Sequence, residues 1–442
     1  MKKALIIGAA VLGLAAAGWS GLWFLGKGEI ESRLEQETAR MEGQGWKLLW
    51  GERSVSGFPF GYDVALSDVI ATSERTGLLI RLGDILARAD GSNPDRIITD
   101  LPPRIDITLP ISEAQRIADP NLPRVVNIAV DSTGLALAAE GFDPTDRTFT
   151  VIADTLAVTV DQDDMAYGVD FQTEAMTATL VSGPVAQQVV FRAGRAMTKL
   201  ANAADPVDPV LTYDYQDMSV TADIAARSLR HFTDQLAANE ASLISGTSVV
   251  GSQTMTLSVA GQGAPGEAAR STMTYTAGAS TALFGLDAGT LTYQGDDTLV
   301  NAVMETTSPS PALKEIKGSA DVYQRRISLP LPFAGATPQE GALRISVSGI
   351  NPDDTLWQAL DAGGVLNRAP GLVEFDVLST LSWVRDGAGG VPLQFSNVTI
   401  EQIAIDALGA RARAKGDIEI LQPIGLPQGK LDIDLKGIEA VL

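Results

Sequence analysis

The side chains that do most enzymatic chemistry are scarce in this chain. Its 442 residues include no cysteine and a single histidine, His231. The lack of cysteine excludes thiolate nucleophiles, Cys-bound zinc and disulfides. A Ser-His-Asp hydrolase would have to use His231, which faces away from the apolar stripe of its expected helix. No lysine has a serine three residues before it, so the S-x-x-K motif is absent.

Two short motifs indicate turns between strands and not ligand sites. Residues 261–266 satisfy G-x-G-x-x-G, but Pro265 interrupts the helix that a dinucleotide site needs. The acidic run that begins at Asp161 is similar to the start of a calcium loop, yet Ala166 stands where that loop requires glycine. The 54 acidic residues offer no spacing that selects a catalytic pair. We therefore expect no metal and no cofactor.

The N-terminus predicts a membrane anchor. Two lysines precede an uncharged run from Ala4 to Leu25. As a helix this run would reach about 33 Å, against a hydrocarbon core of about 30 Å. Trp19 and Trp23 lie near its outer end, four residues apart, which is typical of a membrane interface. A cleavable signal that ends near Ala17 is the alternative.

Charge and orientation signals predict where the body of the protein lies. The short basic tail favours an N-terminus in the cytoplasm. We therefore expect a single-pass protein of the inner (cytoplasmic) membrane, with its bulk in the periplasm. The formal charge of −21 would repel a phosphate backbone, so nucleic acid is not an expected partner. The membrane is the expected partner, with a lipid or another envelope protein as further candidates.

The rest of the chain predicts a mainly β protein, an elongated antiparallel β-structure with a few short helices. From residue 46 onward, alternating runs of Thr, Val, Ile and Leu are separated by Gly, Pro, Asn and Asp. Clear examples are Asp154–Val160, Thr254–Val259 and Val398–Ile405. Their apolar faces could be buried between two sheets, as a sandwich that serves as a scaffold. They could instead line a curved open groove able to hold acyl chains.

An internal repeat supports the strand assignment. Residues 341–350 match residues 429–438 position for position in their alternation, and each run leads into a helix-like segment. Asn351 is the expected cap of the first helix, with Pro352 at its first position. Looser strand-then-helix copies begin at residue 104 and at residue 217, so we expect an internal duplication.

A natural midpoint of the exported part lies near Ser245 and Gly246, after the predicted helix that carries Leu229, Phe232 and Leu236, and we divide the chain there. The C-terminal half stops in the middle of its repeat, as a truncated chain would. The expected parts are a cytoplasmic tail (1–3), a transmembrane helix (4–25), a juxtamembrane stalk (26–45), an N-terminal β-rich half (46–245) and a C-terminal β-rich half (246–442).

The most distinctive string is the run Gly57, Phe58, Pro59 and Phe60. Its proline cannot donate to a ladder, which predicts an edge strand or a bulge. Together with the anchor, this string resembles the signature of an uncharacterised family of membrane-anchored envelope proteins found mainly in alphaproteobacteria. The resemblance covers about Ala4–Leu66 and implies no catalytic residue. Gly61 departs from the family, which often has a basic residue there.

The repeated units and the ending Gly-Lys-Leu-Asp-Ile-Asp-Leu-Lys-Gly are similar to AsmA-like envelope proteins. That similarity implies an N-terminal anchor and an elongated β-structure with an apolar groove. We expect a non-enzymatic, membrane-anchored envelope protein with a scaffold role, or one that binds or transfers a hydrophobic ligand such as a lipid. The alternative is a periplasmic hydrolase with an acidic or Ser/Lys site. Trp46 and Trp50 are interpreted as core anchors.

Overall fold

The computed structural model describes part of the chain, and some sequence-predicted features lie outside that part. These are the expected membrane helix with Trp19 and Trp23, the string Gly57–Phe60, and His231. Within the described residues, no helix has the length and apolar character needed to cross a membrane. The described residues are 35, 38–39, 41–43, 45–437 and 439. The range 45–437 has gaps at 57–60, 75, 91–92, 112–123, 142–146, 163–166, 184–185, 203–209, 226–242, 262–268, 288–289, 307–314, 331–337, 362, 384–392 and 422–425.

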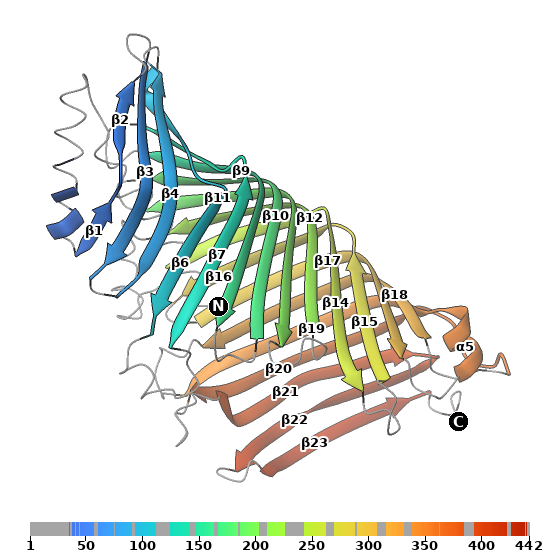
Figure 1. The fold of residues 1–442 in the computed structure, drawn as a ribbon. Helices are drawn as coiled ribbons and strands as arrows, with labels where there is room; N and C mark the ends of the chain where they lie inside the picture. Colours follow the sequence, from blue (N-terminus) through green and yellow to red (C-terminus); the bar gives the residue numbers. More distant parts are fainter. Residues whose placement is uncertain are drawn as a thin grey trace. The chain divides into compact units, whose positions relative to one another are not determined.

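The described part is mainly antiparallel β-structure, as the alternating sequence predicts (Figure 1). The chain forms two compact units. The first unit comprises Met1–Ala196 and Asp223–Thr233, and the second comprises Met197–Ala222 and Asp234–Leu442. Each unit is described by itself. The predicted division at residue 245 stays a prediction.

The first unit is an up-and-down antiparallel meander. At three places two short strands follow one another along a single long neighbouring strand: β1 and β2 both pair with β3, β5 and β6 with β4, and β7 and β8 with β9. Its strands are β1 (Trp46–Leu49), β2 (Arg53–Ser56), β3 (Gly61–Ser73), β4 (Leu79–Asp90), β5 (Asn93–Asp100), β6 (Arg104–Pro110), β7 (Val125–Thr133), β8 (Ala136–Glu140), β9 (Thr148–Gln162), β10 (Tyr167–Ser182) and the first part of β11 (Gln187–Asn202).

The breaks between these short strands fall on one line that crosses the sheet. Left-handed backbone conformations lie on the same line, at Asp68 (φ 50°), Gly83 (φ 67°), Gly134 (φ 63°) and Ala175 (φ 51°). An extra residue in a strand shifts the alternation and bends the sheet. In β3, for example, Val64 and Leu66 are buried before the line, and Val69 and Ala71 after it. We call this feature the bulge line.

The apolar side chains of the first unit form two buried clusters. One includes Ile80, Ile105 and Ile107, each at most 2% exposed. The other includes Val64 and Leu66. Trp46 packs against the first cluster and Trp50 against the second, which confirms their interpretation as core anchors. Burial of each such aliphatic side chain contributes about 1.5–3 kcal/mol.

The second unit continues the same meander pattern. Its bulge line runs through Asp217 (φ 52°), Gly251, Gly278, Leu299 (φ 52°) and Gly349 (φ 71°). Its elements are β12 (Val210–Ile224), β13 (Ile244–Val250), β14 (Ser252–Gly261), β15 (Ala269–Ala277), β16 (Ser280–Asp287), β17 (Thr290–Thr306), β18 (Glu315–Pro330), β19 (Gln339–Pro352), α5 (Asp354–Leu360), β20 (Gly371–Trp383), β21 (Leu393–Ala407), β22 (Ala410–Leu421) and β23 (Leu426–Lys436).

Both halves of the sequence repeat form strands, β19 and β23, as expected. The predicted cap of the helix after β19 is wrong. Asn351 and Pro352 remain in β19, where they pair with Ser319 and Gly318 of β18, and this pairing keeps their backbone extended. The cap of α5 is Asp353, whose Oδ1 accepts a hydrogen bond from the Leu356 amide at 2.8 Å.

Candidate functional site

The second unit has a sheet face on which five neighbouring strands present three adjacent rows without a polar side chain. Residues that lie directly opposite one another in paired strands point to the same face. The register places them in three rows across β19, β20, β21, β22 and β23, and we call these rows the apolar face. The rows are Ile345, Phe375, Ile403, Ala414, Ile433; Val347, Val373, Ile405, Ala412, Leu435; and Leu343, Val377, Ile400, Gly416, Leu431.

Much of the apolar face is open to solvent. The exposed fraction is 41% for Leu343, 40% for Ile405 and 61% for Ile433. Leu431 and Leu435, on the edge strand β23, are exposed as well. In the first unit, by contrast, exposed aliphatic side chains such as Leu49 and Ile152 are few and many others are buried in two clusters. Contiguous apolar surface of this kind marks an interaction site.

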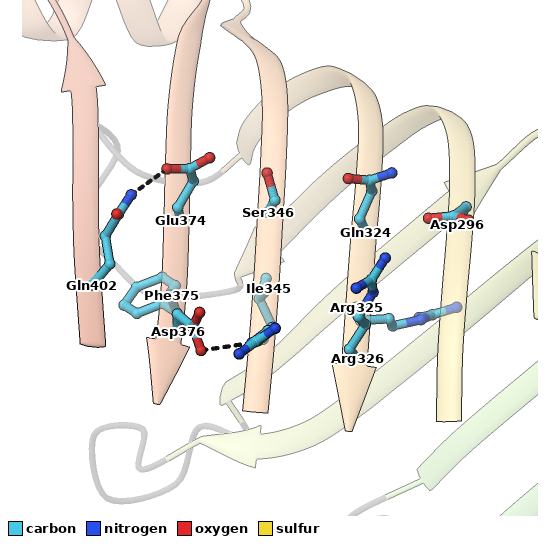
Figure 2. A pocket seen from close by; sticks show the side chains of 11 residues that line it. Asp296, Gln324, Arg325, Arg326, Ile345, Ser346, Glu374, Phe375, Asp376 and Gln402 are labelled. Carbon is cyan, nitrogen blue, oxygen red and sulfur yellow. Dashed lines mark hydrogen bonds and ion pairs between the residues drawn. The ribbon is translucent and has the colours of Figure 1, made fainter. Parts of the chain in front are cut away.

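The opposite face of the same strands is polar and holds a shallow pocket of ≈ 220 Å³. Figure 2 shows polar side chains of neighbouring strands lying in a row across it. Arg344 Nε donates to Asp376 Oδ1 at 2.8 Å, and Gln402 Nε2 donates to Glu374 Oε2 at 2.6 Å. Its lining residues are Asp296, Gln324, Arg325, Arg326, Arg344, Ile345, Ser346, Glu374, Phe375, Asp376 and Gln402.

The pocket has the composition of a solvated sheet face. Its carboxylates Glu374 and Asp376 already accept hydrogen bonds from neighbouring side chains. Among the described residues, no group of three or more His, Cys, Asp or Glu side chains could hold a metal ion. We therefore regard the apolar face, and not this pocket, as the better candidate for function.

A polar cluster lies at the β18 end of the apolar face. Asp297 is fully buried and forms an ion pair with Arg325, whose Nη2 lies 2.9 Å from Oδ2. The carboxylate also accepts hydrogen bonds from Tyr275 Oη and Ser280 Oγ, each at 2.5 Å. The guanidinium lies over the ring of Tyr323, 5.1 Å from its centroid. We call this group the Asp297–Arg325 cluster.

Tyrosine gathers around the cluster. The chain has seven tyrosines, and five of them surround the pair. Arg325 also lies over Tyr293, at 5.5 Å from the ring centroid. Tyr213 and Tyr215 stack with their centroids 6.1 Å apart. Such rings provide both apolar area and a hydroxyl group at one place.

Burial and neighbouring groups shift the pKa values of two tyrosines and of Arg325 in this cluster. Burial raises the pKa of Tyr215 to about 12. Burial and the hydrogen bond to Asp297 also raise the pKa of Tyr275. Burial lowers the pKa of Arg325, but Asp297 together with Tyr293, Tyr275 and Tyr323 outweighs it, and the net shift is upward. Tyr215 and Tyr275 therefore stay protonated at neutral pH.

Sequence reasoning did not select the Asp297–Arg325 cluster. Its signal is a pair of charged residues at positions where the strand alternation calls for apolar ones, since Arg325 lies directly opposite Ile345. The shift of alternation at Leu299 hides this signal, because the bulge line is not visible in the sequence. The signature residues Gly57, Phe58, Pro59 and Phe60 lie outside the described residues, so their role stays a prediction.

Comparisons with known proteins give one match. No curated protein and no solved structure matches the chain. A family model described as an uncharacterized protein conserved in bacteria (DUF2125) matches residues 23–267, which are 245 of the 442 residues. The match includes β1 to β14 and ends before the apolar face. It confirms the resemblance to an uncharacterised family, and the chain belongs to this bacterial family.

Proposed function

We propose that this is a non-enzymatic, membrane-anchored envelope protein that binds acyl chains on its apolar face. The observation that supports the proposal is a set of three uninterrupted apolar rows in which five large aliphatic side chains are exposed and the other residues are half-buried. Covering a large aliphatic side chain contributes about 1.5–3 kcal/mol. A ligand that covers several of these side chains at once would therefore bind well.

The chemistry of the rows favours a lipid over a protein partner. Beyond β18 they contain no side chain that can form a hydrogen bond. Protein interfaces of this size usually include hydrogen bonds and arginine or tyrosine anchors. Four strand spacings of about 4.8 Å give the face a width of about 19 Å. One leaflet of a bilayer core is about 15 Å thick, so an acyl chain fits across the face.

The expected anchor supports the same assignment. A single-pass helix at residues 4–25 would hold the body of the protein close to the inner membrane, which is the source of acyl lipids. The proposed location of the body is the periplasm, and the proposed role is in maintenance of the envelope. The polar pocket gives the hydrolase alternative little support, because two of its three carboxylates, Glu374 and Asp376, already accept hydrogen bonds from neighbouring side chains.

A pair of neighbouring substitutions on β23 tests the proposal. Ile433 lies on the apolar face, and Asp434 lies next to it on the polar face. The full chain in native membranes is crosslinked with a photoactivatable palmitoyl lipid, and the labelled peptides are identified by mass spectrometry. Ile433→Asn should lower labelling of β19–β23 at limiting lipid about tenfold, because it places a polar group on the binding surface. Asp434→Asn should leave labelling unchanged.

Equal labelling of the two variants and the wild type would contradict the proposal. Labelling restricted to the membrane helix would contradict it too, since that helix contacts lipid in any anchored protein.

A scaffold role is the second candidate, and the edge strand β23 is the observation that favours it. Every residue of β23 is exposed, and among the described strands only β22 pairs with it. An open edge of this kind can accept a strand from a partner. Light scattering of the purified full chain distinguishes the two, because edge pairing between copies gives a mass that rises with protein concentration.

A further inference from the structure

A contribution to folding stability does not explain why Asp297 and Arg325 are charged. Two charges have been taken out of water, and a buried ion pair is often no more stabilising than apolar residues of the same volume. Asp297 is fully satisfied, since it accepts from Arg325, Tyr275 and Ser280. Arg325 is not satisfied.

The guanidinium of Arg325 has donors to spare. It has five N–H groups. Among the described residues only Asp297 accepts from it, and that contact uses Nη2. Nε is buried and has no acceptor. About a fifth of the side chain, 22%, remains exposed. A buried donor without an acceptor costs free energy. An acceptor oxygen that forms a hydrogen bond with the guanidinium of Arg325 would therefore gain binding free energy.

The register connects the cluster to the apolar face. Arg325 lies directly opposite Ile345, which begins the first row. Tyr323 lies opposite Val347, which begins the second row. A molecule on the face would therefore meet hydrogen-bonding groups at the β18 end and only aliphatic groups beyond it. This layout matches an amphipathic lipid with one polar end.

We propose that the Asp297–Arg325 cluster binds the carbonyl oxygen of an esterified acyl chain whose hydrocarbon tail lies on the apolar face. This inference rests on the proposed function and specifies its ligand. An uncharged ester is favoured over a free fatty acid, because a carboxylate at Arg325 would also lie close to the negative charge of Asp297. The surrounding tyrosine rings exclude water from the bond.

Two lipids that differ by one oxygen atom test the inference. Monopalmitoylglycerol has the ester carbonyl, and 1-O-hexadecylglycerol has an ether in its place with the same chain length. Each competes, without a label, against the photoactivatable palmitoyl lipid on the full chain in native membranes. The ester should compete about tenfold better than the ether, which is the gain of one hydrogen bond to a charged donor.

Variants on β18 locate the effect. Arg325→Met alone would leave Asp297 buried without its partner and could unfold the unit. The double variant Arg325→Met/Asp297→Asn removes both charges. Its amide oxygen accepts from one of the two hydroxyl groups of Tyr275 and Ser280, and its NH2 group can donate to the oxygen of the other. It should bind ester and ether equally. Arg326→Met alters the neighbouring arginine, which lies on the polar face opposite Arg344, and should keep the tenfold preference.

Equal competition by the ester and the ether in the wild type would overturn the inference, while the proposed binding of acyl chains would still stand. This outcome is measured on the wild type, so it does not depend on whether the double variant folds. A preference that persists in the double variant overturns it as well. If neither lipid competes with the label in the wild type, the proposed function fails together with the inference.

Discussion

Asp297 and Arg325 are two charged residues that the sheet accommodates in a largely buried position. Both occupy positions where the alternation of β17 and β18 calls for apolar side chains. Their mutual charge and the hydroxyl groups of Tyr275 and Ser280 offset the cost of burial. Asp297, whose hydrogen bonds are all made, fixes the positions of Tyr275 and Ser280.

The raised pKa values of the tyrosines predict a loss of stability at high pH. Burial raises the pKa of Tyr215 to about 12 in the folded protein, from the ordinary tyrosine value of 10.0. Between these values the unfolded chain releases the proton and the folded chain keeps it. The free energy of unfolding should therefore fall as the pH rises from about 10 to about 12.

Urea unfolding of the full chain at several pH values measures this fall. Tyr215→Phe provides the control, because it removes the titrating hydroxyl and leaves the ring in place. The fall should be smaller in this variant than in the wild type. An equal fall in both proteins would show that Tyr215 is not the group responsible.

At the scale of elements, the bulge line is the feature that determines which side chains share a face. In β17 it falls at Leu299, which has a positive φ of 52° and a side chain that is 71% exposed. A left-handed backbone costs an L-residue about 1–2 kcal/mol, and glycine avoids that cost. Because the Leu299 side chain is largely exposed, its removal would lose little buried apolar area.

Leu299→Gly should therefore leave the free energy of unfolding unchanged or raise it by about 0.5–1 kcal/mol. Thr298→Gly, one position earlier in the same strand, should lower it by about 1–2 kcal/mol, because a strand glycine adds backbone entropy to the unfolded chain and the variant loses the hydrogen bond that Thr298 Oγ1 donates to the Ala279 carbonyl. Thermal unfolding of the two variants provides the comparison. A larger loss in Leu299→Gly than in Thr298→Gly would contradict this view of the bulge line.

The sequence predicts the strands well and their faces only in part. Period-two alternation identifies Asp154–Val160, Thr254–Val259 and Val398–Ile405, which lie in β9, β14 and β21. Alternation cannot show where an inserted residue shifts the pattern, and for this reason the Asp297–Arg325 cluster was not predicted. The cap of α5 was misplaced for a related reason, since pairing with β18 extends β19 beyond the point where its own residues favour a helix.

At the scale of the whole molecule, the two units have the same meander pattern but differ in how far their apolar side chains are buried. The first unit buries its aliphatic side chains in two clusters. The second unit leaves the side chains of β19–β23 exposed on one face. The family match includes all strands of the first unit and only the first strands of the second. The buried clusters favour a structural role for the first unit, and the apolar face of the second unit is the candidate for binding.

The most direct test of acyl binding is a crosslink from the apolar face itself. The photoreactive residue p-benzoylphenylalanine is placed at position 433 or at position 434 of the full chain, and cells are irradiated before purification. Position 433 points to the apolar face and position 434 to the polar face. Acyl binding predicts a lipid adduct, identified by mass spectrometry, at position 433 and none at 434. Adducts to protein alone at position 433, or equal lipid adducts at both positions, would contradict it.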